Sequence, residues 1–224
     1  GSANPASPDW LETMEWIKMN TPKDAVIAAW WDYGYWIQTL AERATLSDNS
    51  TIHTSVIQEI ARMFLSTPDD GWNMLQKMNA DYVVVFVAGE RLDAQYDDEQ
   101  IYYLSHGGDE SKIPWFIRIA ELPEEKYLES NSSTGTDYFW NETLLGKIIP
   151  FKIVTHYNIA LQKETSIFQP GFIPLSTKEI KYDSDNDPLK LVYASPSFYD
   201  EKTGPMTGIF IYEVNKNYFS PNDQ

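Results

Sequence analysis

The chain has no cysteine among its 224 residues. Without thiols it cannot form disulfides, bind zinc through thiolates or use a cysteine nucleophile. It also lacks the glycine-rich phosphate-binding patterns and the motifs of serine hydrolases and zinc proteases. The sequence therefore carries no signature of these common enzyme classes, and other features must indicate its function.

Long hydrophobic runs are also missing. The longest, residues 25–31 and 82–88, are seven residues each, whereas a helix needs about 20 apolar residues to cross a bilayer. We therefore expect no membrane span within these residues. Residues 1–3, Gly-Ser-Ala, are typical of an expression tag, so we expect natural sequence upstream of them.

Positive charge is scarce. The chain has 17 Lys and Arg against 33 Asp and Glu, for a formal net charge of −16. Such a surface repels phosphate backbones, so we expect no nucleic-acid partner. Hydrophobic residues make up 42% of the chain and aromatic residues 14%, which is enough for a substantial core.

The pattern of apolar residues predicts an α/β fold. Helical spacing covers residues 8–20, 33–41, 54–65 and 69–78, and a further helix is predicted from a cap at Ser111 to about residue 122. Short apolar segments at residues 25–30, 44–47 and 81–87 are typical of buried strands. This alternation favours helices around a short, mostly parallel sheet.

The second half of the chain has a different pattern. Residues 148–161, 189–194 and 208–214 read as strands separated by Pro, Gly and Asp turns, which favours a smaller antiparallel β unit. We therefore predict an α/β core over residues 8–125, a polar linker or insertion over 126–144, and a β-rich peripheral unit over 145–218.

Residues 30–36, WWDYGYW, place two indoles beside a carboxylate at the predicted end of the first strand. Ligands of open α/β sheets bind at this edge. An indole N–H only donates a hydrogen bond, a carboxylate only accepts one, and a hydroxyl does both. Trp30, Trp31 and Asp32 together can therefore saturate one hydroxyl, such as that of Ser or Thr. The alternative is that Asp32 only caps the next helix.

Two further segments accompany this motif, DNST at residues 48–51 and DESKIPWFIRI at residues 109–119. Together the three resemble the C-terminal globular domain of the oligosaccharyltransferase catalytic subunit, of archaeal or eukaryotic type. The resemblance covers about residues 8–120. It implies that Trp30, Trp31 and Asp32 bind the hydroxyl of the +2 residue in an Asn-X-Ser/Thr acceptor sequence.

The resemblance also assigns a D-x-x-K motif to Asp109 and Lys112. Phe116 stands where the family has Met or Ile, four residues after the lysine. Tyr33 and Gly34 are expected to support the motif as structural residues. The alternative for Asp109 and Lys112 is a solvated i,i+3 ion pair, which stabilises a protein by well under about 1 kcal/mol.

The family transfers a lipid-linked oligosaccharide to an acceptor Asn during N-glycosylation. The resemblance implies that the catalytic residues and a divalent metal, Mg or Mn, belong to a membrane-spanning N-terminal region. It places this domain on the extracytoplasmic side of a membrane. We therefore expect no metal site, no catalytic residue and no transferase activity in these residues alone. The predicted partners are the acceptor polypeptide, the lipid-linked oligosaccharide and the transmembrane region.

Three sequons lie within the chain itself, and their acceptors are Asn49, Asn131 and Asn141. They are possible glycosylation sites if the domain lies outside the cytoplasm. Two alternatives to peptide recognition remain open. One is a secreted carbohydrate-binding or sensor module in which Trp30, Trp31 and Trp36 stack on sugars, and the other is a purely structural domain.

Overall fold

The computed structural model describes residues 7–46, 54–105 and 107–218. The helices are α1 (Pro8–Asn20), α2 (Gly34–Thr39), α3 (Thr54–Leu65), α4 (Pro68–Lys77), α5 (Ile113–Ala120), α6 (Glu124–Tyr127), α7 (Asp137–Glu142) and α8 (Leu144–Ile148), with 3-10 turns η1 (Trp31–Tyr33), η2 (Asp109–Ser111) and η3 (Pro196–Tyr199). The strands are β1 (Val26–Ala28), β2 (Ala44–Thr45), β3 (Tyr82–Tyr96), β4 (Glu99–Leu104), β5 (Phe151–Asn158), β6 (Lys163–Thr165), β7 (Ile173–Lys178), β8 (Leu189–Ala194) and β9 (Gly204–Val214).

The first three strands form the parallel part of the sheet, in the order β2-β1-β3. Val26 pairs with Ala44, and Ile27 pairs with both Thr45 and Tyr82. β1 is short and apolar because helices and loops cover it on both faces, as a parallel strand requires. The predicted α/β class is confirmed.

The antiparallel strands extend the same sheet. β9 runs beside β3 with ten paired positions, from Tyr82↔Glu213 to Arg91↔Gly204, and β8 pairs with the other edge of β9. In the described residues, all nine strands belong to one sheet. The strands predicted after residue 145 are indeed antiparallel. β9 lies between β3 and β8, and its residues Ile209, Phe210 and Ile211 are completely buried.

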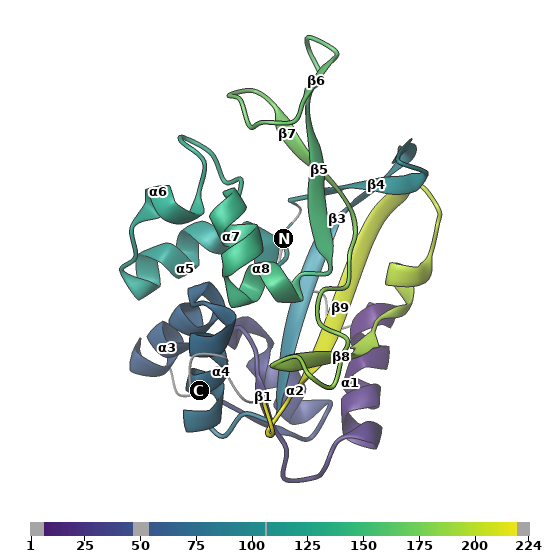
Figure 1. Cartoon of the computed structure of the whole chain (residues 1–224). Helices are drawn as coiled ribbons and strands as arrows, with labels where there is room; N and C mark the ends of the chain where they lie inside the picture. The colour runs from purple at the N-terminus through teal and green to yellow at the C-terminus, as the bar shows by residue number, and fades with distance from the viewer. Residues whose placement is uncertain (1–6, 47–53, 106, 219–224) are drawn as a thin grey trace.

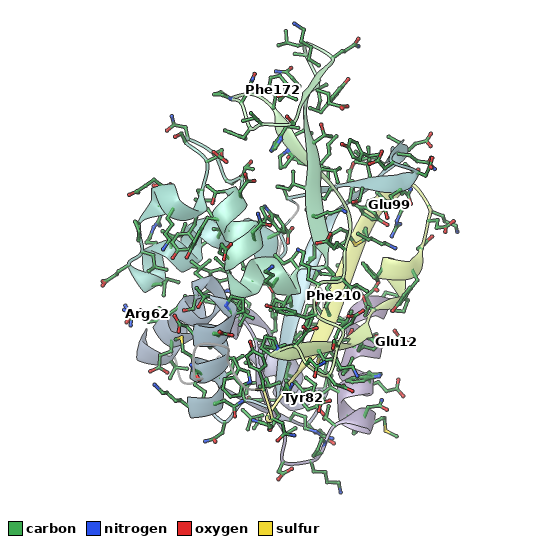
Figure 2. The ribbon with its side chains drawn as sticks, in the orientation of Figure 1. Glu12, Arg62, Tyr82, Glu99, Phe172 and Phe210 are labelled. Carbon is green, nitrogen blue, oxygen red and sulfur yellow. The ribbon has the colours of Figure 1, made fainter. Side chains whose placement is uncertain are left out.

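Helices lie on both sides of the long strands. In Figure 1, α1 lies beside β9, whereas α3, α4, α5, α7 and α8 gather on the other side of β3. β5 and β6 project at the top of the view, beyond the helices. Figure 2 shows side chains filling the space between these layers, with Phe210 near the centre and Phe172 near the projecting end.

Residues 126–144, predicted to be a polar linker or insertion, are partly helical in the structure. They contain α7 and the end of α6, and the Tyr127 and Phe139 side chains are buried. α8 follows at once because Thr143 caps it, accepting from the Gly146 N–H at 3.0 Å. Ile148 was predicted to begin a strand but lies in this helix, and the strand begins at Phe151. The boundaries of the three predicted parts stay a prediction.

Candidate functional site

The WWDYG motif lies on a turn at the end of the first strand, as predicted. β1 ends at Ala28 and the 3-10 turn η1 begins at Trp31, so the motif follows the carboxyl end of a parallel strand. Trp30 is buried, and its ring packs edge-on against Phe116 at a centroid distance of 4.8 Å. The side chain of Trp31 lies outside the described part of the structure, so its predicted role stays a prediction.

Asp32 is the solvent-facing carboxylate of this motif. Its side chain is 43% exposed, and its Oδ2 lies 4.0 Å from the ammonium of Lys112. Partial burial raises the pKa of Asp32, and the negative charge of Asp109 adds to this effect. The charge of Lys112 and a hydrogen bond from the Trp30 side chain oppose the rise. The carboxylate is therefore held by two donors while one side remains open to solvent.

The helix-cap alternative for Asp32 is wrong. The N-cap residue of α2 is Tyr33, and no side chain caps that helix. Because the Trp30 indole N–H donates to the Asp32 carboxylate, Trp30 orients the acid. This contact changes the predicted arrangement, in which both indoles donate to a ligand hydroxyl.

Asp109 is the buried acid of the site. Its side chain is completely buried, Oδ2 accepts from the Phe86 backbone N–H at 2.9 Å, and Oδ1 accepts from the Tyr33 hydroxyl at 2.9 Å. Lys112 Nζ lies 3.3 Å from Oδ1. The alternative of a solvated ion pair is therefore wrong, because three donors from different elements enclose this carboxylate.

Lys112 joins the two motifs. Its side chain is only 16% exposed, and its Nζ donates to the Tyr33 hydroxyl at 2.5 Å and lies 4.6 Å from the centre of that ring. Tyr33 is buried and packs on Trp10 and Phe86. Burial and the nearby Asp109 raise its pKa well above the usual value, so it stays a neutral hydroxyl. Asp109 and Tyr33 thus fix Lys112 where it faces Asp32.

The supporting residues are placed as follows. Gly34 is buried and begins α2. Phe116 is completely buried between Trp30 and Phe64, at 4.8 and 5.5 Å, so it acts as a wall behind the motif tryptophan. The prediction that Ser111 caps α5 is wrong. The cap position is Lys112, because the η2 turn occupies residues 109–111.

Glu110 is a buried acid that the sequence reasoning did not single out. Its Oε1 accepts from the Gly108 N–H at 3.2 Å and the Ala88 N–H at 3.4 Å. Burial raises its pKa to about 8, and the adjacent Asp109 adds to the shift. Adjacent acids at residues 109 and 110 were the only available signal, and in most proteins such a pair is solvated.

Two of the three predicted glycosylation acceptors lie within the described residues. Asn131 and Asn141 are exposed, and Asn131 has a φ of 54°. Asn49 and the segment DNST at residues 48–51 lie outside the described residues. Exposure is a requirement for modification, and whether these asparagines are modified stays a prediction.

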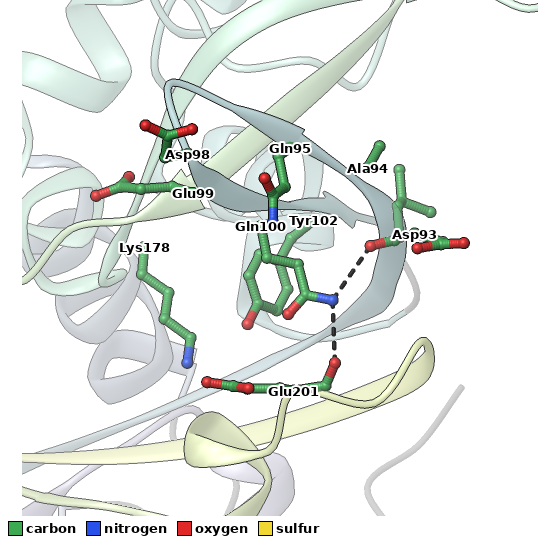
Figure 3. Close-up of a pocket in the computed structure, with 10 residues that line it drawn as sticks. Asp93, Ala94, Gln95, Asp98, Glu99, Gln100, Tyr102, Lys178 and Glu201 are labelled. Atoms are coloured by element: carbon green, nitrogen blue, oxygen red, sulfur yellow. Dashed lines mark hydrogen bonds between the residues drawn. The ribbon is translucent and has the colours of Figure 1, made fainter.

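A second hollow lies at the tip of the β3–β4 hairpin (Figure 3). It has a volume of about 420 Å³, and acidic residues Asp93, Asp98, Glu99 and Glu201 line it beside Lys178. The Gln100 amide donates to the backbone oxygens of Leu92 and Glu201, at 3.2 and 3.1 Å. Lys178 Nζ donates to the Phe198 carbonyl. These contacts hold the hairpin and β7 to the segment that precedes β9, and no described side chain of the WWDYG motif lines the hollow.

The described ranges are residues 7–46, 54–105 and 107–218. No helix in them is long and apolar enough to cross a membrane. No group of three or more His, Cys, Asp or Glu residues in them is arranged to hold a metal ion.

Comparison with known proteins identifies this part of the chain. Residues 22–114 match the STT3/PglB/AglB core domain. The likeness to this core domain spans part of the chain. This confirms the resemblance predicted from WWDYG and D-x-x-K, whose residues 30–34 and 109–112 fall inside the core domain.

The chain is also similar in sequence to curated proteins. The chain is 35% identical over 120 residues to the dolichyl-diphosphooligosaccharide–protein glycosyltransferase subunit STT3 of Saccharomyces cerevisiae, which is 52% of the chain and 15% of that protein. The STT3 subunit of Dictyostelium discoideum is 32% identical over 146 residues, 63% of the chain and 19% of that protein. The chain therefore spans less than a fifth of the length of these relatives.

One solved structure has a similar fold. It is the Archaeoglobus fulgidus oligosaccharyltransferase tethered with an acceptor peptide that contains the NVT sequon. The likeness covers 93% of this chain and 33% of that one, with a TM-score of 0.50 and 13% identity. At this identity the match supports the fold alone.

Proposed function

We propose that this chain is the acceptor-recognition domain of an oligosaccharyltransferase. In this proposal, Asp32 and Trp31 bind the +2 hydroxyl of an Asn-X-Ser/Thr sequence, and Trp30 holds the Asp32 carboxylate in place. Support comes from the core-domain match and from the names of the curated relatives. The observation that carries the proposal is the half-exposed Asp32 carboxylate, held by Lys112 and Trp30 at the carboxyl end of β1.

The chemistry follows from the unequal environments of the two acids. Asp109 has its lone pairs occupied by donors from the protein, so it serves to fix Lys112. Asp32 keeps free lone pairs on its exposed side and accepts the O–H of Ser or Thr. A hydroxyl-binding site of this kind can reject an analogue without the hydroxyl by about 10⁴-fold or more.

The contribution to catalysis is positional. Fixing the +2 hydroxyl holds the acceptor Asn amide near the oligosaccharide donor, which lowers the entropy cost of bringing the two together. As the resemblance implies, the lipid-linked oligosaccharide, the catalytic residues and a divalent Mg or Mn ion belong to the rest of the enzyme. We also propose, on the same ground, that the domain lies on the extracytoplasmic side of a membrane.

The test uses the full-length enzyme and two peptides that differ only at the +2 position, Asn-Ala-Thr and Asn-Ala-Val. We expect Asp32→Asn to raise the KM for the Thr peptide at least about tenfold, because a charge-assisted hydrogen bond is lost. The Val peptide should change little. Asp24→Asn, at an exposed acid just before β1, is the matched control. An equal effect of Asp32→Asn on both peptides would refute the proposal.

The carbohydrate-module alternative is less favoured. Trp30 is buried against Phe116, and Trp36 packs on Trp10 and Tyr33 at 5.6 and 6.4 Å. Trp30 therefore offers no open face for stacking on a sugar, and Trp36 is only partly exposed.

A further inference from the structure

A separate cavity lies between two loops. Its volume is about 480 Å³, and no described WWDYG side chain lines it. One wall is the loop at residues 130–134, which carries serine and threonine hydroxyls. The other is the loop before β7, near the projecting end where Figure 2 labels Phe172. The rings of Tyr103, Phe168 and Phe172 also line the cavity. We call this space the outer cavity.

A small recess adjoins the outer cavity. The two share the lining residues Ser105, Ser133, Thr134 and Pro174. The recess has a volume of about 20 Å³, which holds one group of the size of a water molecule. Glu110 and Trp140 line it. The recess therefore joins an open, neutral space to a buried acid.

Two polar atoms of the recess have no hydrogen-bond partner. They are Oε2 of Glu110 and Nε1 of Trp140. The glutamate is 6% exposed, and its other oxygen is already occupied by the Gly108 and Ala88 N–H groups. Leaving a buried polar atom unpaired is unfavourable, so two such atoms on residues that line one recess indicate a missing partner.

Gly135 allows the loop to lie against the indole. A Cβ at this position would come within 2.6 Å of the Phe139 ring and 3.1 Å of Trp140 Nε1. A side chain at this position would therefore crowd the buried indole N–H. The loop, the tryptophan and the glutamate thus form one built site.

The recess offers donors to its ligand. Two backbone N–H groups point at Glu110 Oε1, so a proton on this carboxyl group resides on Oε2 and makes it a donor. The indole N–H can only donate. Two converging donors fit an acceptor oxygen such as an amide carbonyl. Among the described residues, no Lys, Arg, Asp or Glu lines the outer cavity, so it suits a neutral ligand with hydroxyl groups and an apolar face.

We propose that the outer cavity and its recess bind a neutral acetamido sugar. The sugar ring lies among the aromatic rings and hydroxyls of the outer cavity, and the acetamido carbonyl accepts from Trp140 and Glu110. Such a sugar can come from a free oligosaccharide or from a glycan carried by Asn131, an exposed residue that lines the cavity. The proposal does not depend on acceptor-peptide recognition.

The test follows the tryptophan indole N–H signals by NMR while N-acetylglucosamine is added. Glucose, which lacks the acetamido group, is the matched ligand. We expect the Trp140 signal, identified by its loss in Trp140→Phe, to shift with N-acetylglucosamine. Glucose should bind at least about fivefold more weakly, since it leaves both recess donors unpaired. Trp16→Phe on α1 is the control variant and should bind normally.

Phe172→Ala provides a second variant at a partly exposed position, and it should weaken binding severalfold with the fold intact. To separate the two sources, protein from a glycosylating host is compared with its Asn131→Gln variant. If the Trp140 signal is shifted before sugar is added in the glycosylated protein but not in Asn131→Gln, the ligand is the attached glycan. The proposal is overturned if the signal does not shift at about 50 mM sugar, if glucose acts equally, or if only an acetylated peptide shifts it.

Discussion

The coupling between Lys112 and Asp109 provides the sharpest test of how the two motifs are joined. The perturbation is a double-mutant cycle with Lys112→Met, Asp109→Asn and the double variant. Each single change removes one charge and leaves its partner in a buried place, since the two side chains are 16% and 0% exposed. The double variant removes both charges and replaces the pair with neutral groups of similar size.

The expected magnitude follows from burial. Removing one member of a buried pair costs about 3–5 kcal/mol of stability, because the remaining charge has no partner. In this site Asp109 keeps the Tyr33 and Phe86 donors, so we expect the lower end, about 3 kcal/mol, for Lys112→Met. The double variant should cost clearly less than the sum, which corresponds to a coupling energy of at least about 1.5 kcal/mol.

The assay is urea unfolding of the four proteins followed by tryptophan fluorescence. Lys190→Met is the matched control. Lys190 and Asp185 are closer, at 2.7 Å, but their side chains are 42% and 89% exposed, so we expect a loss of under about 1 kcal/mol. Additive single effects within about 0.5 kcal/mol, or equal losses at the buried and exposed lysines, would contradict the role given to Lys112.

Three further predictions concern stability. The pKa of Glu110 in the folded protein is about 8, above its usual 4.5, so folding stabilises its protonated form. The free energy of unfolding should therefore be highest below about pH 4.5. It should fall as the pH rises through 8, by at most about 5 kcal/mol. Glu110→Gln should remove this slope in urea unfolding at pH 5 and pH 8.5, and a persisting slope would assign it to other groups. Phe116→Ala should lower the free energy of unfolding by about 3–5 kcal/mol, because it opens a cavity beside Trp30. Thermal unfolding measures this loss. A change under about 1 kcal/mol would show that neighbouring side chains repack to fill the cavity. Lys181 Nζ donates to three backbone carbonyls at 2.6–2.9 Å. Lys181→Met should therefore lower the free energy of unfolding by about 3 kcal/mol and speed hydrogen exchange of the α8 amides. Unchanged amide exchange would contradict this prediction.

Local structure could be predicted well from the sequence. α1 and α3 have the predicted boundaries, residues 8–20 and 54–65, because apolar spacing and capping residues are local signals. β3 was predicted to end near residue 87 but continues to Tyr96. Its second half is polar, and pairing with β4 and β9 maintains it. No local pattern carries that information.

The chemistry of the site could be predicted only in part. The donor and acceptor types of Trp30 and Asp32 led to a hydroxyl site, and the D-x-x-K resemblance placed Lys112 beside it. The complete burial of Asp109 and its contact with Tyr33 could not be seen, because residues 76 positions apart meet only in the folded chain. The same holds for Glu110 and Trp140, which reach one recess from different elements.

The central claim is that the Asp32 carboxylate receives the +2 hydroxyl of an acceptor peptide. The most direct measurement is photocrosslinking in the full-length enzyme, with an Asn-Ala-Thr peptide that carries a photoreactive residue directly after Thr. We predict crosslinks to residues 30–33 and 109–116, which disappear in Asp32→Ala and when Val replaces Thr. Crosslinks only elsewhere, or crosslinks at these residues that persist with the Val peptide, would contradict the account.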